Sequence, residues 1–189
     1  MPRPPVLPAI DWRLVFESGA PFDKWIAAGE SAENRATMRE REAAQVLEPH
    51  AAALLGALAR PVHVVAIAED WCGDVVRHVP VLERMARATD QLRVHYIARG
   101  QHKEVFARFL TNGGEAIPKF IFLNDRFVEC GNWGPMPNAC REVIARGKAC
   151  GDVATARKKV GALYEADPER RVVMRELLQL IDTASASAP

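Results

Sequence analysis

The sequence has no run of 18 apolar residues, the length that a membrane-spanning helix needs. Its 25 basic and 24 acidic side chains nearly cancel, so no strong positive charge points to nucleic acid. Residues 1–5 lack the apolar core of a secretory signal. The four cysteines show neither the spacing of a disulfide framework nor a histidine cluster for zinc. We therefore expect a cytoplasmic protein with reduced thiols, no metal site, and neither membrane nor nucleic acid as partner.

The hydrophobic content suffices for one sizeable core, because 49% of the 189 residues are hydrophobic. Aromatic residues between positions 11 and 30 must bury their surface, so this stretch is expected to pack on the domain. The expected organisation is an N-terminal tail and helical extension over 1–59, a core over 60–147, a C-terminal helical extension over 148–183, and a disordered tail over 184–189.

Hydrophobic periodicity predicts an alternating order of strands and helices in the core. The first two strands should be parallel, since a helix joins them, and the last two should form an antiparallel hairpin turning at Asn124-Asp125. The fold class is therefore α/β, with one mixed central sheet and helices on both faces. The predicted strands are 62–68, 92–98, 119–123 and 126–130, and the predicted helices are 75–88, 102–110 and 138–147, followed by a C-terminal helical pair over 153–165 and 168–181.

The most informative motif is Trp71-Cys72-Gly73-Asp74-Val75, at the junction of a predicted strand and a predicted helix. The free N–H groups and dipole of a helix N-terminus favour a thiolate, which is the attacking species in disulfide exchange. The neighbouring acids Glu69, Asp70 and Asp74 act in the opposite direction. Val75 stands where a Cys-x-x-Cys motif would place its second cysteine, so a two-cysteine cycle cannot run here.

Several further motifs accompany Cys72 in order along the chain. Pro80 lies eight residues after it, and Gly131 falls near the end of the last predicted strand. With Glu69-Asp70-Trp71-Cys72-Gly73-Asp74, these motifs are Val79-Pro80-Val81-Leu82, Leu110-Thr111-Asn112-Gly113-Gly114, Ile117-Pro118 and Trp133-Gly134-Pro135-Met136-Pro137. Over about residues 60–147 the chain resembles the thioredoxin fold, and more narrowly a bacterial thioredoxin-like subfamily. It departs from typical thioredoxins at Val75 and at Ala66, where a buried acid would assist proton transfer.

The resemblance implies a redox site in which Cys72 is the catalytic residue. Pro118 would be a cis-proline, and Ile117 before it would pair with an extended peptide laid across the thiol. The other residues expected to bind substrate are Trp71, Gly73, Asp74, Gly131 and Trp133, the last as a lid over the groove.

Two pairings within the site are also expected. The direction of the predicted hairpin would bring Cys130, Gly131 and Trp133 near Cys72, so Cys130 is a candidate distant resolving thiol, although a strand cysteine is more often a small hydrophobe. His78 is expected to pair with Asp74 across one helical turn. The remaining thiols, Cys140 and Cys150, are expected only to pack or to lie at the surface.

Three functions stay open at this point. The first is a monothiol oxidoreductase, in which Cys72 forms mixed disulfides with protein or small-molecule thiols and glutathione serves as co-substrate, with no bound cofactor. The second is a redox-inactive module that binds a peptide or protein in the same groove. The third is a redox sensor, in which Cys72 oxidises to a sulfenic acid. The sequence leaves open whether the protein is a monomer or a homodimer.

Overall fold

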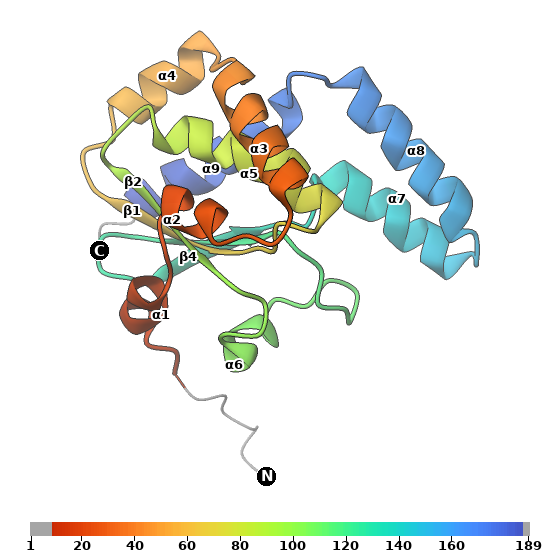
Figure 1. Ribbon diagram of the computed structural model, residues 1–189, viewed down its shortest axis with the longest axis horizontal. Coiled ribbons are helices and arrows are strands. Elements are labelled where there is room, and N and C mark those ends of the chain that lie inside the picture. The colour runs from red at the N-terminus through yellow and green to blue at the C-terminus, as the bar shows by residue number, and fades with distance from the viewer. Residues whose placement is uncertain (1–8, 187–189) are drawn as a thin grey trace.

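A computed structural model describes residues 9–186 of the chain, which form one mixed sheet with helices on both faces (Figure 1). The sheet order is β2-β1-β3-β4. Strands β1 and β2 are parallel, whereas β3 runs antiparallel to both β1 and β4, which confirms the predicted topology. The strands are β1 (Val62–Ile67), β2 (Leu92–Ile97), β3 (Lys119–Leu123) and β4 (Glu129–Trp133).

The helices of residues 9–186 divide unequally between the two faces of the sheet. In Figure 1, α1 and α6 lie below the sheet, whereas α2, α3, α4, α5 and α9 lie above it. The helices are α1 (Trp12–Ser18), α2 (Phe22–Ala27), α3 (Ala32–Ala44), α4 (Pro49–Gly56), α5 (Gly73–Ala86), α6 (Lys103–Phe106), α7 (Asn138–Ala149), α8 (Val153–Ala166) and α9 (Arg171–Ala186).

Helix α5, the crossover between β1 and β2, carries a proline in its interior. Pro80 has no N–H, so the carbonyl of Val76 loses its partner within the helix. Arg41 of α3 supplies the missing donor, because its Nη1 lies 3.2 Å from the Val76 oxygen. The N-terminal extension is therefore bonded to the central helix at the point where that helix is weakest.

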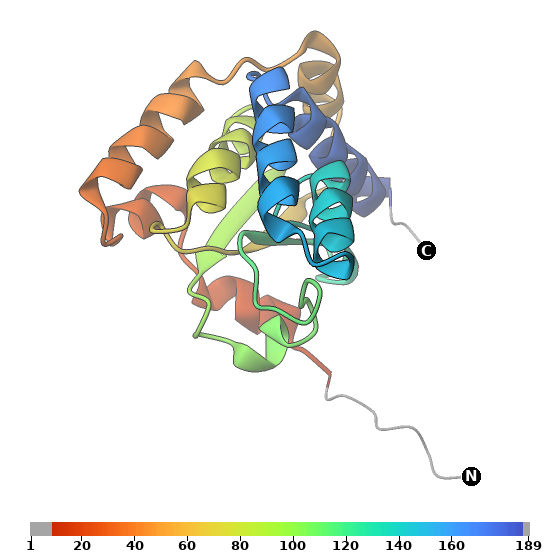
Figure 2. The same ribbon diagram turned by 90° about the vertical axis from the view of Figure 1, so that its right-hand side faces the viewer.

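Helix α9, and not α7, covers the sheet beside α5. It contacts β4, β3 and β1 and buries an apolar stripe that includes Val173, Leu177 and Ile181. Helices α7 and α8 instead pack on each other as a hairpin, which stands in front in Figure 2. The C-terminal helical extension expected over residues 148–183 therefore includes a helix that packs directly on the sheet.

The ends of the chain also differ from expectation. Helix α9 continues to Ala186, and Ala184 is buried, so residues 184–186 are not a disordered tail. The last residues, 187–189, and the Pro-rich start, 1–8, lie outside the described residues.

Strand β4 begins three residues later than predicted. Asn124 forms a longer turn, because its Oδ1 accepts the N–H groups of Arg126 and Val128 at 2.9 Å each. Phe127 in this turn has a left-handed φ of 61°. The hairpin therefore does not turn at Asn124-Asp125 alone, and the residues that β4 brings to each end of the sheet change accordingly.

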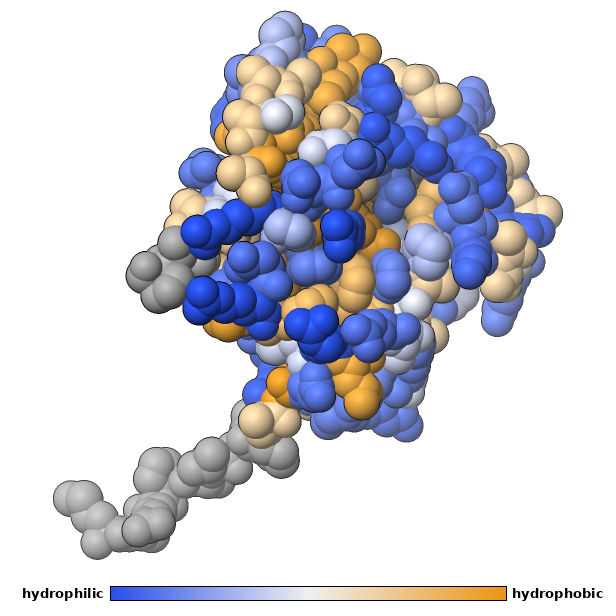
Figure 3. Space-filling model, turned by 90° about the vertical axis from the view of Figure 1, so that its left-hand side faces the viewer, coloured by the Kyte–Doolittle hydropathy of each residue, from blue (hydrophilic) through white to orange (hydrophobic). Residues whose placement is uncertain are grey.

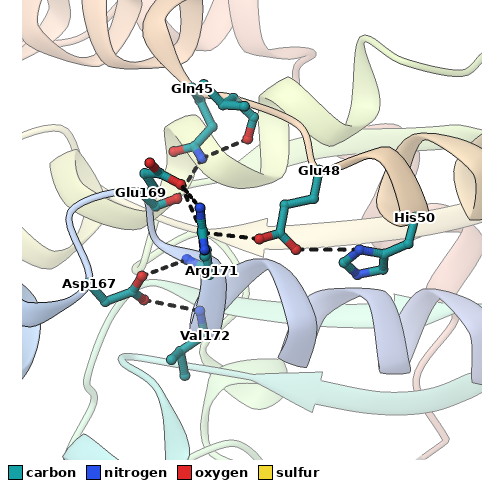
Figure 4. Close-up of polar contacts among 8 residues, drawn as sticks. Gln45, Glu48, His50, Asp167, Glu169, Arg171 and Val172 are labelled. Atoms are coloured by element: carbon teal, nitrogen blue, oxygen red, sulfur yellow. Dashed lines mark hydrogen bonds and ion pairs between the residues drawn. The ribbon is translucent and has the colours of Figure 1, made fainter.

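Polar contacts tie the start of α9 to the N-terminal extension (Figure 4). Arg171 pairs with Glu48, next to α4, at 3.1 Å, and with Glu169 at 2.6 Å. Gln45, after α3, donates to the backbone oxygen of Glu169. Asp167 caps α9 by accepting backbone N–H groups, a favourable place for a carboxylate. The two extensions therefore hold one another as well as the sheet.

The outer surface is mostly polar on the side shown in Figure 3, with hydrophobic side chains gathered at the top, the region of α4 in Figure 1. Among residues 9–186, no helix combines the length and apolar character needed to cross a bilayer.

Candidate functional site around Cys72

Cys72 lies directly before α5 as its N-cap residue, after β1 has ended at the same edge of the sheet. The thiol is free and half-buried. Its Sγ donates to the carbonyl oxygen of Ile117 at 3.4 Å. The peptide bond between Ile117 and Pro118 is cis. The sulfur therefore rests against the loop that the sequence placed opposite it, and part of its surface is open to solvent.

Trp71 lies beside the thiol and is 51% exposed, a high value for a tryptophan. The guanidinium of Arg99 lies over its ring in a cation–π contact, with Cζ 5.7 Å from the ring centroid. Gly73, the first residue of α5, is also exposed, and a side chain there would meet nothing within 4 Å. An incoming molecule can approach the sulfur from this side.

Glu69 and Asp70 precede the site but are engaged away from it. Asp70 is buried and accepts the backbone N–H of Ser31 at 2.7 Å, and Asn34 donates to its carbonyl oxygen. Glu69 accepts the backbone N–H of Arg99. From the sequence, we expected both carboxylates to oppose a thiolate at Cys72. In the structure, their hydrogen bonds instead fix the loop before Cys72 to the N-terminal extension and to the end of β2.

Asp74, in the first turn of α5, does not pair with His78. Its carboxylate accepts hydrogen bonds from Arg77 at 3.4 Å and from the hydroxyl of Tyr164 at 3.3 Å. His78 Nε2 lies 3.3 Å from the same hydroxyl, so Tyr164 of α8 bridges the two residues that were expected to meet. The prediction of a direct pair is therefore wrong, because a side chain from the α7–α8 hairpin lies between them.

Burial sets the protonation states of Asp74 and His78. It raises the pKa of Asp74, against the opposing effects of Arg77 and Tyr164. It also lowers the pKa of His78 well below its ordinary value, and the nearby arginines add to that shift. His78 is therefore neutral near pH 7, and its buried Nδ1 has no hydrogen-bond partner among residues 9–186. The group positions the start of α5 and offers no charged imidazole to Cys72.

Lys119, the first residue of β3, joins the proline loop to the loop after β4. Its side chain is buried, and its Nζ donates to Thr111 Oγ1 at 3.1 Å and to the Gly134 carbonyl at 2.9 Å. Gly134 has a φ of +115°, and a Cβ there would collide with the backbone oxygen of Pro118. Only glycine allows this approach, which holds Pro118 in place beside the thiol.

Trp133 is not a lid over the groove. It is 2% exposed, stacks on Phe120 and meets the ring of His78 edge-on. Its indole N–H donates to Glu176 of α9 at 2.6 Å, and the same carboxylate accepts the backbone N–H of Asn138 at the start of α7. Trp133 is therefore a core residue that anchors the loop between β4 and α7.

Gly131 and Cys130 lie away from the thiol. Gly131 pairs with Phe122, well inside the sheet, and a Cβ on it would come within 2.7 Å of Leu180 of α9. Its small size permits helix packing and does not shape a groove. Cys130 lies one residue further toward the opposite end of β4, so the expectation that it approaches Cys72 is wrong. The cause is the shifted start of β4.

The remaining cysteines do not form a second centre. Cys140 is buried on α7, and burial together with Glu176 and Asp74 raises its pKa, whereas Cys150 is exposed after α7. Within residues 9–186, no group of three or more histidine, cysteine and acidic side chains is arranged to hold a metal ion.

A mixed sheet in this order, with a cysteine at the start of its first crossover helix and a proline loop against the sulfur, defines a thioredoxin-like protein. A family model described as Thioredoxin matches residues 19–156. The chain belongs to this family of thioredoxin-like proteins.

Solved structures share the fold at low sequence identity. A protein of unknown function from Pseudomonas aeruginosa is 17% identical, with a TM-score of 0.72 over 92% of this chain and 98% of that one. An HIV epitope-scaffold is 16% identical, with a TM-score of 0.69 and the same coverage of both chains. No curated protein matches the chain.

Two residues near the site, Lys119 and Tyr164, were not among the site residues expected from the sequence. Lys119 could have been noticed, because a lysine that opens the otherwise apolar strand Lys119–Leu123 has to find buried partners. Tyr164 gave no such signal, since its contact with α5 depends on how the α7–α8 hairpin packs.

Proposed function

We propose that the protein is a monothiol thiol–disulfide oxidoreductase that acts through Cys72. The observation that carries this proposal is the half-buried free thiol at the N-terminus of α5, in contact with the Ile117 carbonyl beside Pro118. The open side near Trp71, which is 51% exposed, gives a disulfide access to the sulfur.

The chemistry requires only one protein cysteine. The Cys72 thiolate attacks the glutathione sulfur of a glutathionylated protein, a new Cys72–glutathione disulfide forms, and the protein thiolate leaves and takes a proton from water. A free glutathione thiolate then attacks the glutathione sulfur of that mixed disulfide. Glutathione disulfide and the Cys72 thiolate are released, so the free thiol supplies the reducing electrons.

Val75 and Ala66 support an external resolving thiol over an internal one. Both side chains are fully buried and apolar, so neither a second thiol nor a buried acid stands where a dithiol thioredoxin has them. The same two residues also favour the alternative of a redox-inactive binding module, in which Cys72 is only part of the binding surface.

Turnover separates these functions. The assay measures release of a thiol from a glutathionylated peptide in the presence of glutathione, for the wild type, Cys72→Ser and Cys150→Ser. We expect activity in the wild type, retention in the Cys150→Ser control and loss in Cys72→Ser. A wild type that performs no better than buffer would favour the binding module, and equal rates for Cys72→Ser and wild type would place the chemistry elsewhere.

A further inference from the structure

A polar cleft opens next to the proline loop, on the face of the sheet away from α5. It has a volume of about 630 Å³ and lies between the loop of residues 108–112, the start of β3, β4 and helix α7. We call it the Lys119 cleft, after the buried lysine in its wall. The other charged and amide residues that line it are Arg108, Asn112, Asn132, Asn138, Arg141 and Glu142.

The Lys119 ammonium group has only neutral partners. Its Nζ donates to a threonine hydroxyl and to a backbone carbonyl, which leaves one of its three donors unused. Among residues 9–186, no carboxylate forms an ion pair with it. Burial and the positive charge of Arg141 lower its pKa to about 8. A buried cation without a counter-charge is costly, so the cleft would gain from an anion.

Arg141, on the first turns of α7, is a second cation without a carboxylate. Its Nη2 donates to the Asn138 side chain, and its Nε is buried with no hydrogen-bond partner in the described chain. The nearest acid in sequence, Glu142, pairs with Arg146 at 3.6 Å. Glu142 also lines the cleft, but its ion-pair partner is Arg146, so among residues 9–186 neither Lys119 nor Arg141 forms an ion pair with a carboxylate.

The cleft begins close to the thiol. Lys119 follows Ile117 by two residues, and two residues of extended chain span about 7 Å. Ile117 is the residue whose carbonyl contacts Cys72. A substrate whose disulfide lies at Cys72 can therefore extend an acidic group toward Lys119 and Arg141.

We propose that the Lys119 cleft binds a carboxylate of the disulfide substrate, so that the protein selects anionic thiol compounds such as glutathione conjugates or acidic peptides. This inference rests on the function proposed for Cys72 and names the substrate class of that site. Lys119 supplies a charged donor, and the Arg141 guanidinium can donate to a carboxylate in a planar fork.

Binding tests the cleft without redox chemistry. The probe is S-methylglutathione, titrated calorimetrically into the Cys72→Ser protein, which cannot exchange disulfides. We expect Lys119→Met and Arg141→Met, each added to that background, to weaken binding about tenfold. Lys158→Met, at an exposed position on α8, serves as the charge-matched control and should bind like the parent. Equal affinity in all four proteins, or no binding in the parent, would overturn the inference for glutathione.

Turnover then distinguishes the two sources of carboxylate. With Cys72 intact, we compare the wild type, Lys119→Met and Arg141→Met by their KM for glutathione disulfide, for an Asp-containing peptide disulfide, and for neutral hydroxyethyl disulfide. We expect the KM ratio of an anionic to the neutral substrate to rise about tenfold in Lys119→Met and Arg141→Met. A rise for the peptide alone identifies acidic proteins as the source, whereas unchanged ratios for both anionic substrates refute the proposal.

Failure of this inference is separable from failure of the proposed function. Lys119-dependent binding of S-methylglutathione without any turnover would leave the cleft valid and reject the oxidoreductase. Turnover through Cys72 that does not depend on substrate charge would support the oxidoreductase and reject the anion-binding role of the cleft. Arg141→Met, on a partly exposed helix, keeps the test open if Lys119→Met does not fold.

Discussion

Stability of the protein should fall with rising pH because of one buried carboxyl group on α5. Glu83 is 6% exposed and accepts the hydroxyl hydrogen of Tyr96 at 2.7 Å. Burial raises its pKa to about 7 from an ordinary 4.5, despite the opposing effects of Tyr96 and Arg87. The change that tests this is Glu83→Gln, since glutamine keeps an oxygen acceptor for Tyr96 and cannot ionise.

The magnitude follows from the two pKa values. Each pKa unit corresponds to about 1.4 kcal/mol, so the difference between 4.5 and about 7 is worth about 3 kcal/mol. Below pH 4.5 the group is protonated in both states, and its contribution to folding is complete. Between pH 4.5 and 7 the unfolded chain ionises while the folded protein keeps its proton, so the free energy of unfolding decreases. Above pH 7 the loss levels off.

The assay is urea unfolding at pH 5, 6, 7 and 8. We expect Glu83→Gln to gain stability relative to wild type as the pH rises, approaching about 3 kcal/mol at pH 8. The matched control is Glu165→Gln, at an exposed position on α8, which should follow the wild-type profile. If the Glu83→Gln and wild-type profiles run parallel across this range, the carboxyl ionises normally in the folded protein and the reasoning fails.

Three other predictions concern packing and cysteine placement. Arg41→Met should cost about 1 kcal/mol in urea unfolding, because it removes the donor to the carbonyl that the proline of α5 leaves free. Gly131→Ala should cost about 1–3 kcal/mol, since its φ of +154° strains any residue with a Cβ and the end of the Leu180 side chain must move aside. Gly161→Ala, in open space on α8, should instead stabilise by about 0.5–1 kcal/mol. Oxidised protein should contain no disulfide between Cys72 and Cys130 by peptide mass spectrometry.

Each of these has a result that contradicts it. An unchanged unfolding midpoint for Arg41→Met would mean that solvent satisfies the free carbonyl as well as the arginine does. A Gly131→Ala protein as stable as wild type would show that α9 shifts without cost. Recovery of the Cys72–Cys130 crosslink would show that β4 moves well away from the register described above.

The core of the fold could be predicted from the sequence because it depends on local hydrophobic patterns. The pattern of a continuous apolar strand, an amphipathic helix after Cys72 and a second strand predicts two parallel strands. The parallel pairing of β1 and β2 confirms this prediction. The two short strands that follow were placed in the correct antiparallel relation. The position of Cys72 at the start of α5 followed from the same pattern.

The errors came from contacts that join distant or unusual parts of the chain. The side chain of Asn124 bonds two backbone groups and lengthens the hairpin turn, which moved β4 and with it the positions of Cys130 and Trp133. The sequence could have indicated that α9 rather than α7 covers the sheet, because α9 has the longer apolar stripe. The Tyr164 bridge between Asp74 and His78 depends on packing that periodicity does not encode.

The most direct measurement of the central claim is the identity of the cysteine that forms a mixed disulfide. The reduced protein is exposed briefly to limiting glutathione disulfide, quenched with acid and analysed by peptide mass spectrometry. We expect a glutathione adduct on Cys72 that disappears when free glutathione is added. An adduct confined to the exposed Cys150, with Cys72 still a free thiol, would contradict it.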